Sequence, residues 1–134
     1  MRIDGGCHCG KVSYEAHADP DKAGICHCTD CQAISGSPYV AYIPVPKEGF
    51  KLRGQPKIYV KTAASGSRRA QAFCPECGSR LWASAETDPQ VFNLRLGGVR
   101  QRAQLAPKTQ VWCGSALPWS MDLRAVKQHV KQAM

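Results

Sequence analysis

The sequence predicts a mainly β fold with little helix, and three features of the chain support this expectation. Nine prolines and twelve glycines divide its 134 residues into short blocks. Several of these blocks alternate apolar and polar residues, as half-buried strands do. Closely spaced cysteines lie between the blocks, in positions where metal ions can hold short strands and turns together. A chain of this length is expected to form one domain over residues 1–134.

The expected strands follow one another along the chain. The first covers residues 11–16, and the turn sequence DPDK at 19–22 ends it. Residues 39–46 form a β-rich block whose two prolines favour a sheet edge or a strand end. Further strands are expected at 57–61, 70–73, 80–83 and 91–96, the last of which is closed by two glycines.

Helical signals occur in only two places. Residues 29–33 can form a short turn of helix. Residues 120–133 predict an amphipathic C-terminal helix, because basic residues separate the apolar residues Met121, Leu123, Val126 and Val130.

Composition limits the compartment and the partners that we expect. No apolar run has the length of a signal peptide or a membrane span, so we expect a cytoplasmic protein with no membrane contact. Eight cysteines in a reducing compartment indicate metal binding or thiol chemistry rather than disulfides. The net charge of +8 comes from scattered basic residues, which are typical of a solvated surface or attract an anionic small molecule or a nucleic acid. No block of five like charges and no nucleic-acid signature is present, which argues against a nucleic-acid partner.

Two cysteine pairs predict a closed four-sulfur zinc site. Cys7 and Cys9 are two residues apart, so in an extended segment both sulfurs point the same way. Cys74 and Cys77 form a Cys-x-x-Cys turn, and Gly78 permits the left-handed backbone that completes it. Simple buried thiols are the competing interpretation, but two close pairs in one chain favour a shared structural zinc.

The remaining cluster, Cys26, Cys28 and Cys31, predicts a second zinc with three protein ligands. Its fourth position is open to water, a substrate, Cys113 or a histidine. His27 should point away from its two cysteine neighbours. Cys113, in the sequence VWCG, is expected to be a buried small apolar residue.

An open zinc site with three thiolates suits a fourth sulfur ligand, because the metal is soft. A thiol that binds there loses its proton and becomes a nucleophile that can add to a carbonyl. The sequence that follows supplies candidate substrate-binding residues in Ser35, Gly36 and Ser37, whose hydroxyls and backbone N–H groups can hold a carboxylate or an oxyanion. A plain polar turn is the alternative interpretation of these three residues.

Taken together, these motifs resemble a known family. The sequence GGCHCGKV at 5–12, the pattern CHCxxC at 26–31 with SGS at 35–37, the sequence FCPECGS at 73–79 and the late Pro118-Trp119 are similar to the glutathione-dependent formaldehyde-activating family. The resemblance covers about residues 3 to 119, and the order and spacing of seven cysteines make it specific.

The resemblance implies an Mss4-like fold of antiparallel β-sheets organised by two zinc ions. It implies that the structural zinc ligands are Cys7, Cys9, Cys74 and Cys77, and that the catalytic zinc ligands are Cys26, Cys28 and Cys31. It also implies a carbon–sulfur lyase that condenses glutathione with formaldehyde to S-hydroxymethylglutathione. Two positions depart from the family pattern: Gln32 stands where some relatives carry arginine, and Gln110 stands where a histidine is expected.

Three functional hypotheses follow from the sequence. The first is a zinc enzyme that binds a thiol such as glutathione and handles its aldehyde adduct. The second is a non-catalytic zinc scaffold that binds nucleic acid or protein through its basic surface, with an affinity that falls steeply with salt. The third is zinc storage or thiol-redox sensing at the three-cysteine cluster. The sequence does not specify the physiological thiol, the direction of the reaction or the oligomeric state.

Overall fold

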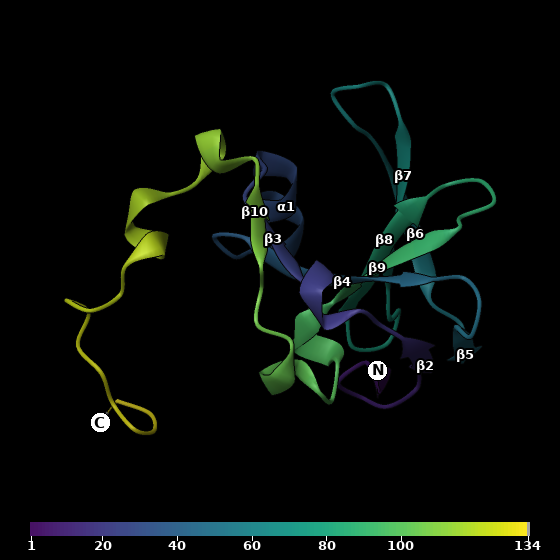
Figure 1. Cartoon of the computed structure of the whole chain (residues 1–134), viewed down its shortest axis with the longest axis horizontal. Coiled ribbons are helices and arrows are strands. Elements are labelled where there is room, and N and C mark those ends of the chain that lie inside the picture. The colour runs from purple at the N-terminus through teal and green to yellow at the C-terminus, as the bar shows by residue number, and fades with distance from the viewer. Residues whose placement is uncertain (134) are drawn as a thin grey trace.

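Two β-sheets carry most of the chain in the computed structural model, which describes residues 1–133 (Figure 1). The smaller sheet has the order β1–β2–β5 and contains β1 (Arg2–Gly6), β2 (Ser13–His17) and β5 (Lys51–Arg53). The larger has the order β10–β3–β4–β9–β8–β7–β6 and contains β3 (Gly24–Cys26), β4 (Val40–Pro46), β6 (Lys57–Thr62), β7 (Arg68–Phe73), β8 (Arg80–Ala85), β9 (Val91–Arg95) and β10 (Thr109–Val111). Every named pair is antiparallel except β10 with β3, which is parallel. The mainly β prediction is confirmed.

Helix is scarce, as the sequence predicts. Among the described residues, the α-helix is α1 (Thr29–Ser35), which includes the short helical turn expected at 29–33. The 3-10 turns are η1 (Pro20–Lys22), η2 (Leu96–Gly98), η3 (Arg102–Gln104), η4 (Cys113–Ser115) and η5 (Pro118–Met121). In the described part of the chain, no helix has the length and apolar character needed to cross a bilayer.

The proline-containing strand β4 lies inside the large sheet rather than at its edge. It runs between β3 and β9, so the edge expectation is wrong, although Pro46 does end the strand. The pairing with β3 stops at Tyr42, whereas the pairing with β9 continues through Pro46. Pro44 therefore has a strand on one side only, and its missing N–H group removes no ladder bond on the other side.

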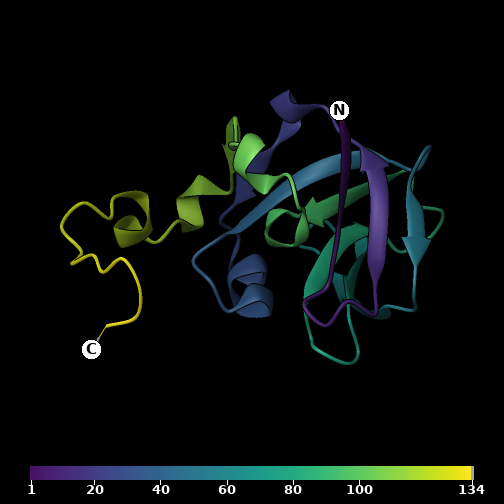
Figure 2. The same ribbon diagram turned by 90° about the horizontal axis from the view of Figure 1, so that it is seen from below.

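The predicted C-terminal helix is wrong for the described residues. After η5 the segment 122–133 forms turns and irregular chain that run away from both sheets (Figures 1 and 2). Leu123, Val126 and Val130 remain exposed. An amphipathic pattern stabilises a helix mainly when its apolar face packs against another surface, and a helix shorter than about 12–15 residues is marginal alone. Among the described residues, no surface packs against the apolar side chains of segment 122–133.

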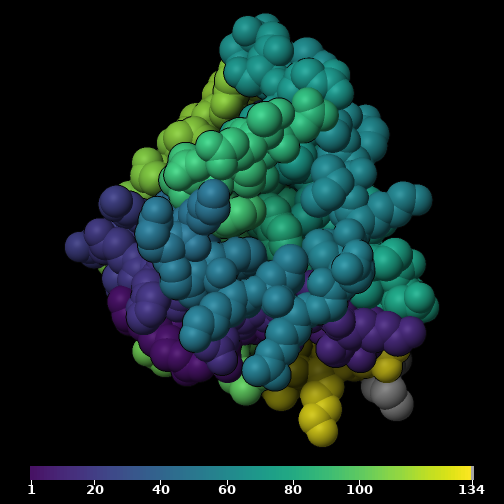
Figure 3. Space-filling model, turned by 90° about the vertical axis from the view of Figure 1, so that its right-hand side faces the viewer, coloured from purple at the N-terminus to yellow at the C-terminus, as the bar shows by residue number. Residues whose placement is uncertain are grey.

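The two sheets share one hydrophobic core. Its fully buried side chains come from both sheets and the turns between them, and they include Ile3, Val12, Ile43, Val45, Leu81, Leu94 and Val99. The Phe50 ring joins the sheets, with its centroid 4.5 Å from that of Phe92 and 5.4 Å from that of Trp82. Seen from the side opposite the C-terminal segment, the N-terminal residues and the middle of the chain form one continuous surface (Figure 3). This core fixes the loops that carry the cysteines.

Candidate metal centres and active site

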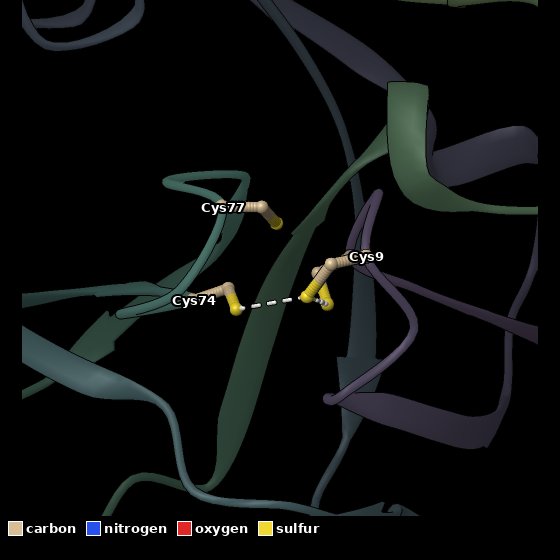
Figure 4. Close-up of side chains that lie close together, drawn as sticks. Cys9, Cys74 and Cys77 are labelled. Atoms are coloured by element: carbon tan, nitrogen blue, oxygen red, sulfur yellow. Dashed lines mark hydrogen bonds between the residues drawn. The ribbon is translucent and has the colours of Figure 1, made fainter.

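The first cysteine cluster joins a loop of the smaller sheet to a turn of the larger sheet. Cys7 and Cys9 lie in the loop between β1 and β2, while Cys74 and Cys77 lie in the turn between β7 and β8. The four sulfur atoms all lie within 4.8 Å of one another, with 3.6 Å between Cys7 and Cys9 and 3.7 Å between Cys9 and Cys74. The sulfurs of Cys9, Cys74 and Cys77 point toward one another (Figure 4). Tetrahedral zinc with Zn–S bonds of about 2.3 Å separates its sulfurs by roughly 3.8 Å, so this donor set fits that metal.

Local backbone geometry explains why the sulfurs converge. Gly78 has a φ of +76°, and its N–H group donates to the Cys74 carbonyl at 2.8 Å. The Ser79 hydroxyl accepts a hydrogen bond from the His8 N–H at 3.0 Å and contacts the Cys77 sulfur at 3.2 Å. A β-bulge at Ala72/Phe73 changes the register just before the turn. Ser79 therefore links the two cysteine-bearing loops.

The sulfurs of this cluster differ in acidity. The hydrogen bond with the Ser79 side chain, with help from the Ser79 backbone, lowers the pKa of Cys77 to about 5. The Lys11 backbone N–H favours the Cys9 thiolate, but burial and the neighbouring thiols raise the pKa of Cys9 to about 11. A metal ion removes this difference, because every coordinating thiol is deprotonated.

The second cluster surrounds the start of α1. Cys26 ends β3, Cys28 is the N-cap of α1, and Cys31 lies in the first helical turn. The three sulfurs lie within 4.8 Å of one another. The Cys28 sulfur accepts the Cys31 backbone N–H at 3.2 Å, in the way that a serine or aspartate N-cap accepts a helix N–H group. The cap hydrogen bond thus places two of the three sulfurs at the same helix end, where the macrodipole favours thiolates.

Ionisation of the three-sulfur cluster is shared between its members. Hydrogen bonding with the Cys31 thiol is the main cause that lowers the pKa of Cys26 to about 5, and the Cys28 backbone and the charge of Arg95 add to it. The same contact with Cys26 raises the pKa of Cys31. The three thiols therefore behave as a coupled group that holds a thiolate at neutral pH.

His27 lies between two of these cysteines but faces the other way. Its side chain is completely buried, and its Nε2 lies 2.8 Å from the Gln110 Oε1. The Gln32 amide donates to the carbonyls of His27 at 2.9 Å and Ser115 at 3.0 Å. Gln32 and Gln110 therefore hold the cysteine loop against residues 110–115.

Cys113 does not have the buried position that its sequence predicts. It is exposed and starts η4, and it is absent from both sulfur clusters of the described chain. The preceding residue, Trp112, has a positive φ of 58° and is itself exposed. The apolar sequence VWCG thus runs from the end of β10 into η4, and Val111, Trp112 and Cys113 are all exposed.

The predicted substrate-binding residues lie at the C-terminal end of α1. The Ser35 hydroxyl donates to the Cys31 carbonyl at 2.6 Å, so its proton is used within the helix. Gly36 ends the helix with a φ of +64°, and its N–H group donates to the Gln32 carbonyl at 2.9 Å. Ser35 and Ser37 line a cavity of about 300 Å³ that also reaches Cys31.

The three-sulfur cluster opens into a second cavity of about 390 Å³, which is basic. Lys61, Arg69 and Arg95 contribute cations to its lining, and Trp112 lines it as well. The Lys61 ammonium lies 3.0 Å from the Asp30 carboxylate. Arg95 donates to the Gln71 Oε1 at 3.3 Å and has no carboxylate partner among the described residues. Burial lowers the pKa of Arg95 and the neighbouring cysteine thiolates oppose that effect, so its charge is balanced mainly by sulfur.

Arg95 was not among the site residues predicted from the sequence. One signal was available, because Arg95 is the charged residue within the strand-like sequence VFNLRL at 91–96. A charged residue in a block that is otherwise apolar or amide-bearing is expected to have a partner if the strand is buried. Lys61 and Arg69 gave no comparable signal, since they resemble ordinary exposed strand residues until β6 and β7 bring them beside the cysteines.

Comparisons with known proteins agree with the cysteine pattern. The sequence profile of the family described as "Glutathione-dependent formaldehyde-activating enzyme" matches residues 2–115. A Schizosaccharomyces pombe protein named as an uncharacterized lyase is 28% identical over 79 residues, which are 59% of this chain and 55% of that protein. The chain thus spans about half the length of this curated relative. A crystal structure of a Rhodobacter sphaeroides protein covers 81% of this chain and 99% of its own, with a TM-score of 0.61 at 17% identity, and this likeness concerns the fold.

Proposed function

The chain belongs to the glutathione-dependent formaldehyde-activating enzyme family, and from that premise we propose a lyase-type enzyme that joins a small anionic thiol to an aldehyde and reverses the reaction. Glutathione is the thiol that the family indicates. The observation that carries the proposal is the three-sulfur cluster, which opens into a cavity lined by three cations. Both clusters are proposed zinc sites, structural for the four sulfurs and catalytic for the three.

We assign different roles to the residues that line the basic cavity. Cys26, Cys28 and Cys31 would hold the zinc, which would supply a soft Lewis acid that favours a thiolate as a further ligand. Lys61 and Arg69 attract the carboxylates of the incoming thiol. The reaction forms one C–S bond, moves the carbonyl π pair to oxygen and leaves the thiol proton on that oxygen.

Arg95 is the best candidate to stabilise the oxygen that becomes negative. It lines both cavities together with Cys31 and Gln71. Ser35, the earlier candidate, already donates its proton to a helix carbonyl. Ser37 lines the smaller cavity and stays as a proposed contact for the substrate. The Gly36 N–H group is already used by the Gln32 carbonyl, and Gly36 does not line that cavity.

Two measurements test this function. Native mass spectrometry should find two zinc ions per chain, with glutathione adding to the complex or displacing one ion only. NMR exchange spectroscopy should show that the protein accelerates exchange between glutathione, formaldehyde and their adduct above the uncatalysed rate. Arg95→Met should slow that exchange roughly tenfold or more. Arg124→Met, which removes an arginine whose side chain is 91% exposed, is the matched control. Acceleration that persists in Arg95→Met would remove this role, and no acceleration by the wild type would refute the enzyme.

The zinc-scaffold hypothesis predicts a different use of the basic residues. A nucleic-acid surface needs cations spread along an accessible face. Lys61, Arg69 and Arg95 instead converge on one cavity beside the cysteines, which supports a small anionic ligand. We further propose a cytoplasmic location, because all eight cysteines are free thiols and seven of them form two clusters suited to metal.

A further inference from the structure

The smaller cavity beside the three-sulfur cluster has the wrong size and lining for formaldehyde. Its volume is about 300 Å³, roughly ten times the share of one water molecule in the liquid. Apolar side chains make up most of its lining and come from Ile34, Tyr39, Val40, Ala41, Ala72 and Trp82, while its polar lining includes Gln71, Arg80 and Arg95. Formaldehyde has two non-hydrogen atoms and would leave most of this space empty. A cavity of this size is typical of sites for organic ligands.

The two cavities meet at the reacting position. Cys31, Gln71 and Arg95 line both of them. A carbon bonded to a sulfur at the three-cysteine cluster would therefore lie at the boundary, with the basic cavity on one side and the apolar cavity on the other. The charged ends of a thiol such as glutathione match Lys61 and Arg69 in the basic cavity. The apolar cavity is left for the other reactant.

We propose that the apolar cavity binds the organic substituent of the carbonyl substrate, so that the enzyme takes aldehydes R′CHO in which R′ is an apolar group of several carbons. This inference rests on the proposed function. The thiol RSH adds to R′CHO to give RS–CH(OH)R′: one C–S bond forms, the carbonyl π pair moves to oxygen, and the thiol proton ends on that oxygen. Burial of R′ against Ile34 and Trp82 contributes binding in proportion to its apolar area.

Ile34 offers a way to test the cavity, because α1 also provides a matched control. Ile34 is half-buried and lines the cavity, whereas the neighbouring Ala33 is exposed and lines neither cavity. Ile34→Trp fills the space, and Ala33→Trp places the same tryptophan side chain on the solvent side of the same helix. Melting temperatures of both variants check that they fold. Ala41→Phe fills the cavity from β4 and serves if Ile34→Trp does not fold.

The assay is NMR exchange between glutathione and its adduct, run in parallel with formaldehyde and with 3-methylbutanal. The wild type should accelerate both. In Ile34→Trp the ratio of the 3-methylbutanal rate to the formaldehyde rate should fall by about tenfold, as expected when an apolar pocket loses space for a few carbons. Ala33→Trp should keep the wild-type ratio.

The two proposals fail in different ways. If the wild type accelerates neither exchange, the proposed function is wrong. If it accelerates the formaldehyde exchange but not that of 3-methylbutanal, the enzyme stands and the inference about the apolar cavity is wrong. An equal ratio in Ile34→Trp and Ala33→Trp would likewise overturn the inference. If the ratio changes in the same way when a short thiol without carboxylates replaces glutathione, then R′ rather than the thiol occupies the cavity, and the inference is supported.

Discussion

The four-sulfur cluster should stabilise the fold far more than the three-sulfur cluster, because it joins distant parts of the chain. Cys9 and Cys74 are 65 residues apart in sequence, whereas the three-sulfur cluster lies within residues 26–31. If each metal-filled cluster is treated as a cross-link, loop-closure entropy gives about 4 kcal/mol for the long loop. The same relation gives about 2 kcal/mol for the short one.

Two double variants compare these values directly. Cys9→Ser/Cys77→Ser removes one sulfur from each loop of the four-sulfur cluster, and both residues are exposed, so serine leaves no cavity in the core. Cys26→Ser/Cys28→Ser removes two sulfurs of the other cluster. For a chain of this length each kcal/mol shifts the melting temperature by about 4 °C. We expect losses of about 15 °C for the first variant and about 8 °C or less for the second.

Thermal unfolding followed by circular dichroism, with zinc content from native mass spectrometry, measures both effects. Chelation of all zinc from the wild type is the control, and it should reproduce at least the larger loss. Equal losses in the two variants, or a larger one in Cys26→Ser/Cys28→Ser, would refute the assignment of a structural and an open site.

Three further predictions concern acidity, packing and the C-terminal segment. In the chelated, reduced protein, the rate of Cys26 alkylation should follow an apparent pKa of about 5 rather than 9, because the Cys31 thiol stabilises the Cys26 thiolate. Labelling should therefore be lost only as the pH falls through 5. A midpoint near 9 would contradict this prediction. Gln110→Ala should destabilise the fold by about 1–3 kcal/mol, since it leaves the buried His27 without its hydrogen-bond partner on Nε2. Denaturant unfolding measures this loss, and Gln104→Ala, at an exposed glutamine, is the control. Removing residues 122–134 should change the free energy of unfolding by less than about 0.5 kcal/mol, because the apolar side chains described there are exposed; a larger change would reveal packing onto the body.

Much of the fold could be predicted because its signals are local. Alternation identified β2 and β6, strand-like blocks identified β7, β8 and β9, and the Cys-x-x-Cys turn with its glycine identified the junction between β7 and β8. Cysteine spacing also divided seven cysteines into the two groups that the structure brings together. These features depend on residues a few positions apart, for which chain geometry leaves few choices.

Other features depended on packing that no local pattern contains. The segment 120–133 has a helical pattern, but no surface among the described residues covers its apolar face, and after η5 it forms turns and irregular chain. Cys113 lies in the apolar sequence VWCG, which predicted burial, but its side chain is exposed in the fold. β10 pairs in parallel with β3, and a pairing of that kind between distant segments leaves little trace in either strand.

The sequence by itself determined the chemistry available to this protein: seven cysteines in two spaced sets, a mainly β framework and a positive charge. The tertiary structure decided where that chemistry can be used. Arg95 lies at the boundary of two cavities because β9 ends beside the three-sulfur cluster, and Lys61 and Arg69 reach the same place from β6 and β7. The physical reason is that position along a strand determines the face of the sheet from which a side chain projects. Only the order of the strands in the sheet determines which residues that side chain contacts.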